Sequence, residues 1–375
     1  MNKTAKDLVY LLSCAVNGIK PDTEKVQAID LESLYSLAKA HTLRAAVYIA
    51  LQSAGVSDHN FRQAYNKAVR KNVMLDVERT AIFAELERRG IWYMPLKGSI
   101  LKELYPENGM REMADNDILY DSTKQSEIKE VMLGMGYSAE SVGKTHHDVY
   151  MKPPVLNFEL HTKLFGASSD FYDYYENPKR LMIPDESSKY GFHFSDEDFY
   201  VYMLAHEYKH FSGGGTGLRS LLDCYVFLQH KGDTLNWDYI HEQTKQLDIA
   251  DFEHEQRELA EKVFSSVTFP ELAEHEQELL DYYLTSCTYG TTTRAGENMV
   301  KKLYSKSKSK TKLEYIWRRI FPDLNHMKTW FPFFYKHKLL LPIGYIWRII
   351  RAPFIRKERI KAELKALNKY DNKKL

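Results

Sequence analysis

The sequence has few of the features that mark secreted, membrane-spanning or disulfide-stabilised proteins. Its 375 residues include 3 cysteines, which are Cys14, Cys224 and Cys287. Because they are odd in number and far apart, they predict no disulfide framework and fit a reducing compartment. The longest apolar run near the C-terminus, Leu339 to Trp347, has 9 residues, whereas a spanning helix needs about 20. An apolar stretch near the N-terminus is too short for a secretory signal. We therefore expect a cytoplasmic protein.

The chain also has little net charge, at +1, but this balance hides a strong asymmetry. Residues 301–375 contain 21 Lys or Arg and 5 Asp or Glu, whereas residues 1–300 contain 31 and 46. Aromatic residues are interleaved with the basic ones. Such a tail suits an anionic membrane, here the inner face, or single-stranded nucleic acid. It could equally pack onto the acidic body of the same chain.

The residue pattern predicts an α+β protein with a small mixed sheet between N-terminal and C-terminal helical regions. The expected parts are an N-terminal helical region at 1–88, a sheet core at 89–165, a C-terminal helical domain at 166–300 and a basic aromatic tail at 301–375. Inside the core, strands are predicted at 91–96 and 115–120, helices at 98–104 and 124–134, and a hairpin at 147–161. Alternating Ser and Lys from Lys306 to Lys310 predict a linker.

Three carboxylates give the strongest chemical signal. Asp115 and Asp117 are two residues apart on a predicted strand, so their side chains should point from the same face. Glu159 is on a later predicted strand. Such an oxygen-rich set suits Mg²⁺ or Mn²⁺. Acids also occur commonly at solvated strand ends, which is the structural alternative.

Several further motifs occur in a fixed order around these acids. They are Leu96-Lys97-Gly98, Leu104-Tyr105-Pro106, Arg111, Asp115-x-Asp117-Ile118-Leu119, Glu159-Leu160-His161, Leu204 to His210 and Gly217-Leu218-Arg219. Together they resemble the bacterial "uncharacterised nucleotidyltransferase" family of the polymerase-β-type nucleotidyltransferase superfamily, over about residues 30 to 230. The resemblance implies that the sheet core is a nucleotidyltransferase core.

The resemblance also implies an activity and a role for each motif residue. The activity is Mg²⁺-dependent or Mn²⁺-dependent transfer of a nucleoside monophosphate from a nucleoside triphosphate, with release of pyrophosphate. The acceptor stays open: a sugar, a small metabolite, an antibiotic or a protein. The implied sets are Asp115, Asp117 and Glu159 for metal binding and catalysis, Lys97, Gly98, Ser99 and Arg111 for the nucleotide, and His210 and Arg219 on the acceptor side. Asn116 and Tyr120 depart from the aliphatic residues common in the family, which indicates a more polar strand.

Two functions of other classes compete with this interpretation. His206-Glu207-Tyr208-Lys209-His210 satisfies the H-E-x-x-H pattern of zinc metalloproteases, in which two histidines on one helix face bind Zn²⁺ and the glutamate is the base. No third histidine follows at the expected spacing. The other alternative is a non-catalytic binding protein with a nucleotidyltransferase fold. Retention of all three acids argues against it.

Overall fold

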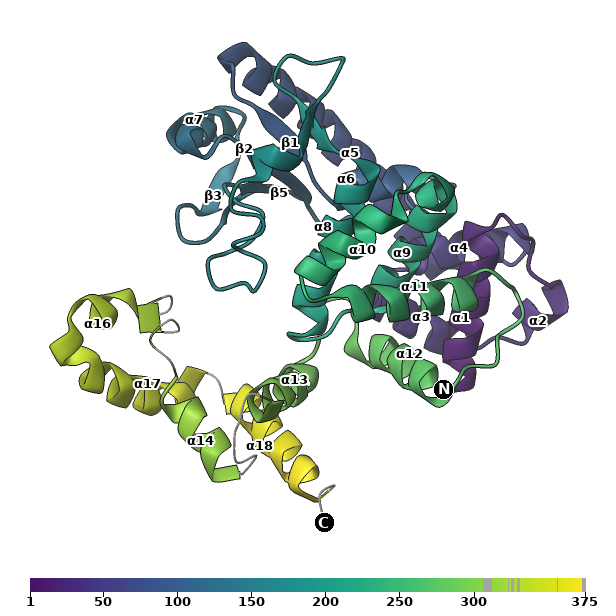
Figure 1. The fold of residues 1–375 in the computed structure, drawn as a ribbon. Helices are drawn as coiled ribbons and strands as arrows, with labels where there is room; N and C mark the ends of the chain where they lie inside the picture. The colour runs from purple at the N-terminus through teal and green to yellow at the C-terminus, as the bar shows by residue number, and fades with distance from the viewer. Residues whose placement is uncertain (306–311, 323, 325–326, 329–330, 356, 373–375) are drawn as a thin grey trace.

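The computed structural model describes residues 1–375 except 306–311, 323, 325–326, 329–330, 356 and 373–375 (Figure 1). The predicted linker at Lys306 to Lys310 therefore lies outside the described residues. The described helices and strands are α1 (Lys3–Val16), α2 (Thr23–Gln27), α3 (Leu31–Ala40), α4 (Arg44–Ser53), α5 (His59–Arg89), β1 (Tyr93–Pro95), α6 (Gly98–Leu101), β2 (Asn116–Tyr120), α7 (Gln125–Gly134), β3 (Ser138–Ser141), β4 (His147–Lys152), β5 (Leu156–His161), β6 (Met182–Pro184), β7 (Phe192–Phe194), α8 (Asp196–Phe211), α9 (Leu218–Lys231), α10 (Trp237–Gln246), α11 (Ala250–Phe264), α12 (Glu274–Ser286), α13 (Thr292–Ser305), α14 (Lys312–Ile320), α16 (Pro332–Lys336), α17 (Leu341–Ile355) and α18 (Lys357–Asn372).

A five-stranded mixed sheet forms the core, in the order β1-β2-β5-β4-β3. Strands β2 and β5 run parallel, and the other pairs run antiparallel. The predicted α+β class is confirmed, as are the predicted strands and hairpin. One helix differs, because α6 ends at Leu101 and a 3-10 turn continues to Leu104.

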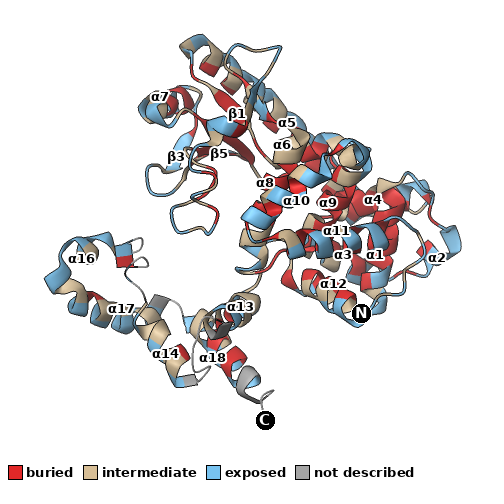
Figure 2. Cartoon of the chain, viewed as in Figure 1, coloured by how far each residue is buried: buried red, intermediate tan, exposed pale blue. Residues whose placement is uncertain are grey.

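The two helical regions share one hydrophobic core, although the sheet separates them in sequence. Helices α1 and α4 contribute Leu8, Leu12 and Val47, and helices α9 and α11 contribute Leu222 and Val263. These helices contact one another, and Figure 2 shows buried residues gathered where they meet. A smaller core under the sheet is formed by α5, α7 and the strands. The helical regions are thus neighbours in space and not independent flanks.

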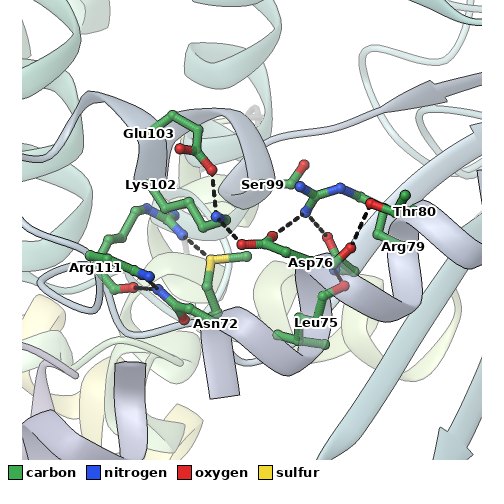
Figure 3. Close-up of polar contacts among 12 residues, drawn as sticks. Asn72, Leu75, Asp76, Arg79, Thr80, Ser99, Lys102, Glu103 and Arg111 are labelled. Atoms are coloured by element: carbon green, nitrogen blue, oxygen red, sulfur yellow. Dashed lines mark hydrogen bonds and ion pairs between the residues drawn. The ribbon is translucent and has the colours of Figure 1, made fainter. Parts of the chain in front are cut away.

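The long helix α5 holds the segment that connects β1 to β2. It ends at Arg89, and Gly90 caps it with a left-handed φ of 68°, which suits glycine. From its middle, Asn72 donates to the Arg111 carbonyl at 3.3 Å, and Asp76 accepts from Lys102 Nζ at 2.7 Å (Figure 3). The same Lys102 Nζ contacts Glu103. These contacts fix a connection that has little regular structure of its own.

The polar residues of strand β2 are buried and satisfied internally. The Asn116 amide donates to the Leu75 carbonyl and accepts from Arg79. The Tyr120 hydroxyl donates to Asp148. The strand is therefore more polar than an aliphatic one, as the sequence indicates, and its polar groups tie the sheet to α5 and β4.

The C-terminal helices extend away from the main body (Figure 1). Helix α13 packs on α18, and Val300, Tyr315, Ala366 and Leu367 form a small separate core. None of the helices in the described part of the chain combines the length and apolar character needed to cross a bilayer.

Candidate active site

The most constrained acid is Asp117 on β2, between strands β1 and β5 of the sheet. One carboxylate oxygen lies 2.7 Å from His161 Nε2, and the other lies 3.4 Å from Lys97 Nζ. Its backbone carbonyl accepts from the Leu96 amide. The side chain is buried, so the alternative of a solvated strand end does not hold for this residue. Asp117 is instead fixed by a cation and a donor.

The other two predicted acids lie around the same cavity. Glu159 is the register partner of Asp117 across the parallel pair β2–β5, so both side chains point from one face. Asp115 lies immediately before β2 and also lines the cavity. The cavity has a volume of about 450 Å³ and lies between the sheet and helices α8 and α9. The structure thus brings together all three carboxylates that the sequence pattern selected.

The three carboxyl groups differ in their proton affinity. Burial and the neighbouring Asp117 charge raise the pKa of Asp115. Burial, with the charges of Asp117 and Asp115, raises the pKa of Glu159 to about 7. Burial acts in the same direction on Asp117, but Lys97 and His161 hold its pKa well below the ordinary value. A cation bound among these groups would relieve the repulsion between them.

The turn after β1 places two of its three predicted nucleotide-binding residues in the cavity. Lys97 has a left-handed φ of 43°, which is uncommon for a residue other than glycine. Gly98 approaches Arg111 and Met113 so closely that a Cβ there would lie 2.7 Å from Arg111 Nη1. The Ser99 hydroxyl, in contrast, donates to the Leu96 carbonyl and stabilises the turn itself. Because α6 has only four residues, its contribution to anion binding is small.

Arg111 lines the cavity, but its charge is matched inside the protein. Its Nε and Nη2 donate to the two carboxylate oxygens of Asp223 at 2.8 and 2.9 Å. The Tyr105 hydroxyl donates to the same carboxylate at 2.7 Å. This buried bidentate pair joins the sheet unit to α9. In this arrangement Arg111 holds the site together through Asp223, and its charge is already neutralised before any phosphate binds.

Other basic groups face the cavity from the helical side. Arg219 donates to the Thr42 hydroxyl and the Glu112 carbonyl, which are both neutral. Lys209 comes from α8, and burial with the nearby Lys97 charge lowers the pKa of Lys209 to about 8. The predicted acceptor-side residues His210 and Arg219 both line the cavity. Lys97, Lys209 and Arg219 together give it the positive charge that a polyphosphate requires.

The H-E-x-x-H segment has the histidine spacing of a zinc protease but not its geometry. On α8, His206 Nε2 and His210 Nε2 are 3.3 Å apart. The Glu207 carboxylate, however, accepts from Gln256 at 2.5 Å and from Tyr283 at 3.0 Å, both buried. It is therefore committed to the helical core and is not free to act as a base. Within the described residues, neither histidine belongs to a group of three metal ligands.

Sequence reasoning missed a cluster of histidines on the sheet side of the cavity. His161 follows Glu159 by two residues, so strand alternation alone places it on the same face. His147 is its register partner on β4, and His146 precedes that strand. Burial, with the neighbouring histidines, lowers the pKa of His146 to about 3 and of His147 to about 4. The signal was present in the spacing of Glu159 and His161 and in the hairpin register.

The donor atoms fit a divalent metal ion. The ligand atoms of Asp117, Glu159 and His161 all lie within 4.8 Å of one another. Two of the three are carboxylates, and Asp115 adds a third carboxylate on the same cavity wall. The carboxylates of this set suit Mg²⁺ or Mn²⁺.

Comparison with known protein families agrees with this geometry. The model of a family described as an uncharacterised nucleotidyltransferase matches residues 27–265. This stretch contains every site residue named above. Comparison with curated proteins and with solved structures gives no significant match.

Proposed function

Because this chain belongs to the uncharacterised nucleotidyltransferase family, we propose that it transfers a nucleoside monophosphate group from a nucleoside triphosphate to an acceptor. The observation that carries the proposal is the meeting of Asp115, Asp117 and Glu159 on one wall of a cavity whose opposite side is basic. A volume of about 450 Å³ falls in the usual range of small-molecule sites.

The proposed reaction is a displacement at the α-phosphorus. An acceptor oxygen forms a bond to this phosphorus, the bond to the oxygen that bridges the α- and β-phosphates breaks, and pyrophosphate leaves. Glu159 accepts the acceptor's proton, because a pKa of about 7 suits a general base near neutral pH. Lys97, Lys209 and Arg219 offset the negative charge of the phosphates.

Asp115 and Asp117 would hold Mg²⁺ or Mn²⁺, and Glu159 beside them would either complete this metal site or accept the acceptor's proton. A bound divalent ion supplies charge neutralisation for the reacting oxygens. Lys97 and His161 keep Asp117 ionised and oriented, so that the carboxylate is ready to bind a cation. The protein contributes mainly by positioning the reacting groups. The β1–β2 connection, which α5 holds in place, keeps the site residues in position.

The acceptor would bind between the sheet and helices α8 and α9. His210 and Arg219 line this part of the cavity and offer one polar donor and one cation. Such a surface suits an acceptor with hydroxyl or anionic groups, which includes a sugar, a small metabolite, an antibiotic or a protein side chain.

The direct test is a panel of nucleoside triphosphates with Mg²⁺ or Mn²⁺ and an extract of the source cells as the supply of acceptor. We expect metal-dependent release of pyrophosphate by the wild-type protein and none by the Asp115→Asn variant. Release at the same rate by both proteins would contradict the assignment. The Val73→Ser variant, which changes an exposed residue of α5, is the matched control.

We also propose that the tail contacts an anionic membrane surface at its periphery. Large apolar side chains of the tail are exposed in the described residues, with Leu339 95% and Phe354 86% exposed. The same segment carries the excess of basic residues. Apolar side chains that are exposed beside basic ones suit the interface of an anionic bilayer.

Co-sedimentation with vesicles of anionic phospholipid tests this proposal. A variant with Leu339, Ile350 and Phe354 each replaced by serine should remain folded and lose binding, because these side chains are exposed. The matched control replaces Val73 and Val77, which are exposed on α5. Equal sedimentation of the triple variant and the wild type would overturn the proposal. Binding to single-stranded nucleic acid and not to vesicles would assign the tail to that partner.

A further inference from the structure

The three histidines on the sheet side of the cavity form a compact, nitrogen-rich group. The ligand atoms of His146, His147 and His161 all lie within 4.8 Å of one another. Ligand atoms around a tetrahedral ion with metal–nitrogen distances of 2.0–2.1 Å are about 3.4 Å apart. Small rotations of the side chains therefore suffice to bring the three nitrogens to one ion.

His161 has one ring nitrogen bound and one free of partners. Its Nε2 must donate to Asp117, because an ionised carboxylate only accepts. Its Nδ1 consequently carries a lone pair, yet it is buried and has no hydrogen-bond partner. The side chain is only 3% exposed. A buried acceptor without a partner is costly, so its retention requires an explanation.

His147 repeats this arrangement on the neighbouring strand. Its Nε2 lies 3.5 Å from a Glu159 carboxylate oxygen, and its Nδ1 is also buried without a partner. A histidine that gives one nitrogen to a carboxylate and keeps the other available is the usual form of a metal-binding histidine. His161 has this form, and its register partner His147 on β4 has one nitrogen near a carboxylate and the other without a partner.

The position of His146 is fixed by the backbone beside it. Its carbonyl accepts from the amides of Thr162 and Lys163, just after His161. The ring is packed close to Gly166, where an added Cβ would lie 3.2 Å from its Nδ1. The third imidazole is thus held against the other two and is not a freely moving surface side chain.

We propose that His146, His147 and His161 bind a transition-metal ion such as Zn²⁺, at a site separate from the three carboxylates. Imidazole ligands select Zn²⁺ and similar ions over Mg²⁺. All three residues line the cavity, so a three-histidine site leaves a coordination position open toward it. An oxygen of a phosphate or of an acceptor hydroxyl is the ligand that this position would take. His161 couples the two sites through its bond to Asp117.

This proposal does not rest on nucleotidyl transfer, because binding is measured without nucleotide. The full-length protein, stripped with a chelator, is titrated with Co²⁺ as a spectroscopic substitute for Zn²⁺, and stoichiometry is measured by equilibrium dialysis. We expect one tightly bound Co²⁺ per chain with the visible absorption of a nitrogen-ligated ion, apart from weaker binding at the carboxylates. The His146→Ala/His147→Ala variant should bind at least about 100-fold more weakly, beyond the roughly 10–100-fold effect of losing a residue that only supports a ligand.

Two control variants separate this site from its neighbours. His206→Ala/His210→Ala removes the other histidine pair in the cavity and should leave Co²⁺ affinity unchanged. Asp115→Asn, which alters the carboxylate site, should also leave it unchanged. Unchanged affinity after loss of His146 and His147, or loss only in the His206/His210 variant, would overturn the proposal.

A measurement on the wild-type protein keeps the test valid even if the histidine variants fold poorly. Imidazole ¹⁵N resonances of the labelled protein, assigned beforehand, are followed as Zn²⁺ is added. Those of His146, His147 and His161 should shift together at one equivalent. A shift confined to His206 and His210, or to no histidine, would contradict the assignment.

Discussion

At the scale of single residues, the two aspartates of the Asp-x-Asp motif have different environments. Asp117 is buried between Lys97 and His161, whereas Asp115 has a raised pKa because of burial and the Asp117 charge. The ionised Asp117 carboxylate thus stabilises the fold, whereas the ionised Asp115 carboxylate destabilises it. The same conservative substitution should therefore have opposite effects on stability at the two positions.

We predict that Asp115→Asn and Asp117→Asn both abolish transfer but separate in thermal unfolding. Asp115→Asn should leave the melting temperature unchanged or raise it, because a repelled charge is removed. Asp117→Asn should cost about 3 kcal/mol or more, since it leaves the buried Lys97 without its partner. Thermal unfolding gives the melting temperatures, and denaturant unfolding near neutral pH gives the free energies of unfolding. Equal stability of the two variants would show that the Lys97 pair is unimportant.

Glu207 provides a prediction about pH. Burial raises its pKa from 4.5 to about 8. Between these values the folded protein keeps a proton that the unfolded chain has lost, so stability falls as pH rises through this window. Glu207→Gln should flatten this part of the stability profile, measured by urea unfolding from about pH 5 to pH 8. Glu197→Gln is the control, because the Glu197 pKa is lowered by a hydrogen bond from the Asn236 backbone. A wild-type slope in Glu207→Gln would refute the assignment.

Residue types and spacing predicted the acids of the site but not their partners. Asp115, Asp117 and Glu159 follow from strand alternation and motif order, which are local properties. The pairing of Arg111 with Asp223 joins residues more than 100 positions apart, and no local pattern specifies it. The commitment of Ser99 to its own turn also depends on backbone geometry. The sequence pattern therefore predicts Arg111 and Ser99 as nucleotide-binding residues, although in the fold they bond to Asp223 and to the Leu96 carbonyl.

At the scale of elements, helices α5 and α9 determine where the site lies. Helix α5 holds the β1–β2 connection from one side through Asn72 and Asp76 (Figure 3). Helix α9 holds it from the other through Asp223. The strands predicted at 91–96 and 115–120 and the hairpin at 147–161 are present, because alternation and turn residues are local signals, whereas the edge strand β3 was not predicted. The packing of α1 and α4 against α9 and α11 required tertiary information.

The Arg111–Asp223 pair should contribute strongly to stability. Asp223→Ala leaves a buried guanidinium without its bidentate partner, and we expect a loss of about 3–5 kcal/mol in the free energy of unfolding. Asp196→Ala is a matched control, because Asp196 pairs with Lys231 at 3.0 Å on the surface and should cost less than about 1 kcal/mol. Urea denaturation measures both changes. Similar costs in the two variants would show that burial of the pair adds nothing.

At the scale of the whole molecule, the described helices of the tail pack mainly on one another and on α13, and Lys302 pairs with Asp170 of the body at 3.0 Å. The small core of the tail joins α13 to α18, and Val300 is fully buried there. Contact with the body includes Asn298, which donates to the Phe211 and Gly213 carbonyls. Composition revealed the charge asymmetry, but it could not show which apolar residues would be covered. The change in charge at residue 301 therefore does not mark a suitable point for truncation, because α13 crosses it and packs on α18.

This arrangement predicts that a longer deletion is better tolerated than a shorter one. Deleting 306–375 removes α14 and α18 and exposes Val300 and Leu303 on α13. Deleting 292–375 removes α13 as well, so the apolar face of α13 is not left uncovered. We expect the first protein to aggregate and the second to remain monomeric in size-exclusion chromatography. The reverse result would show that α13 belongs to the body and not to the tail.

The central claim is that Asp115, Asp117 and Glu159 direct chemistry to the α-phosphorus of a nucleoside triphosphate. The most direct measurement follows two labels in one reaction, one on the α-phosphate and one on the γ-phosphate, with Mg²⁺ and cell extract. We predict that the α-label enters a new product while the γ-label appears in pyrophosphate, and that Asp115→Asn does neither. Transfer of the γ-label to the product, or an unchanged product in Asp115→Asn, would contradict the account.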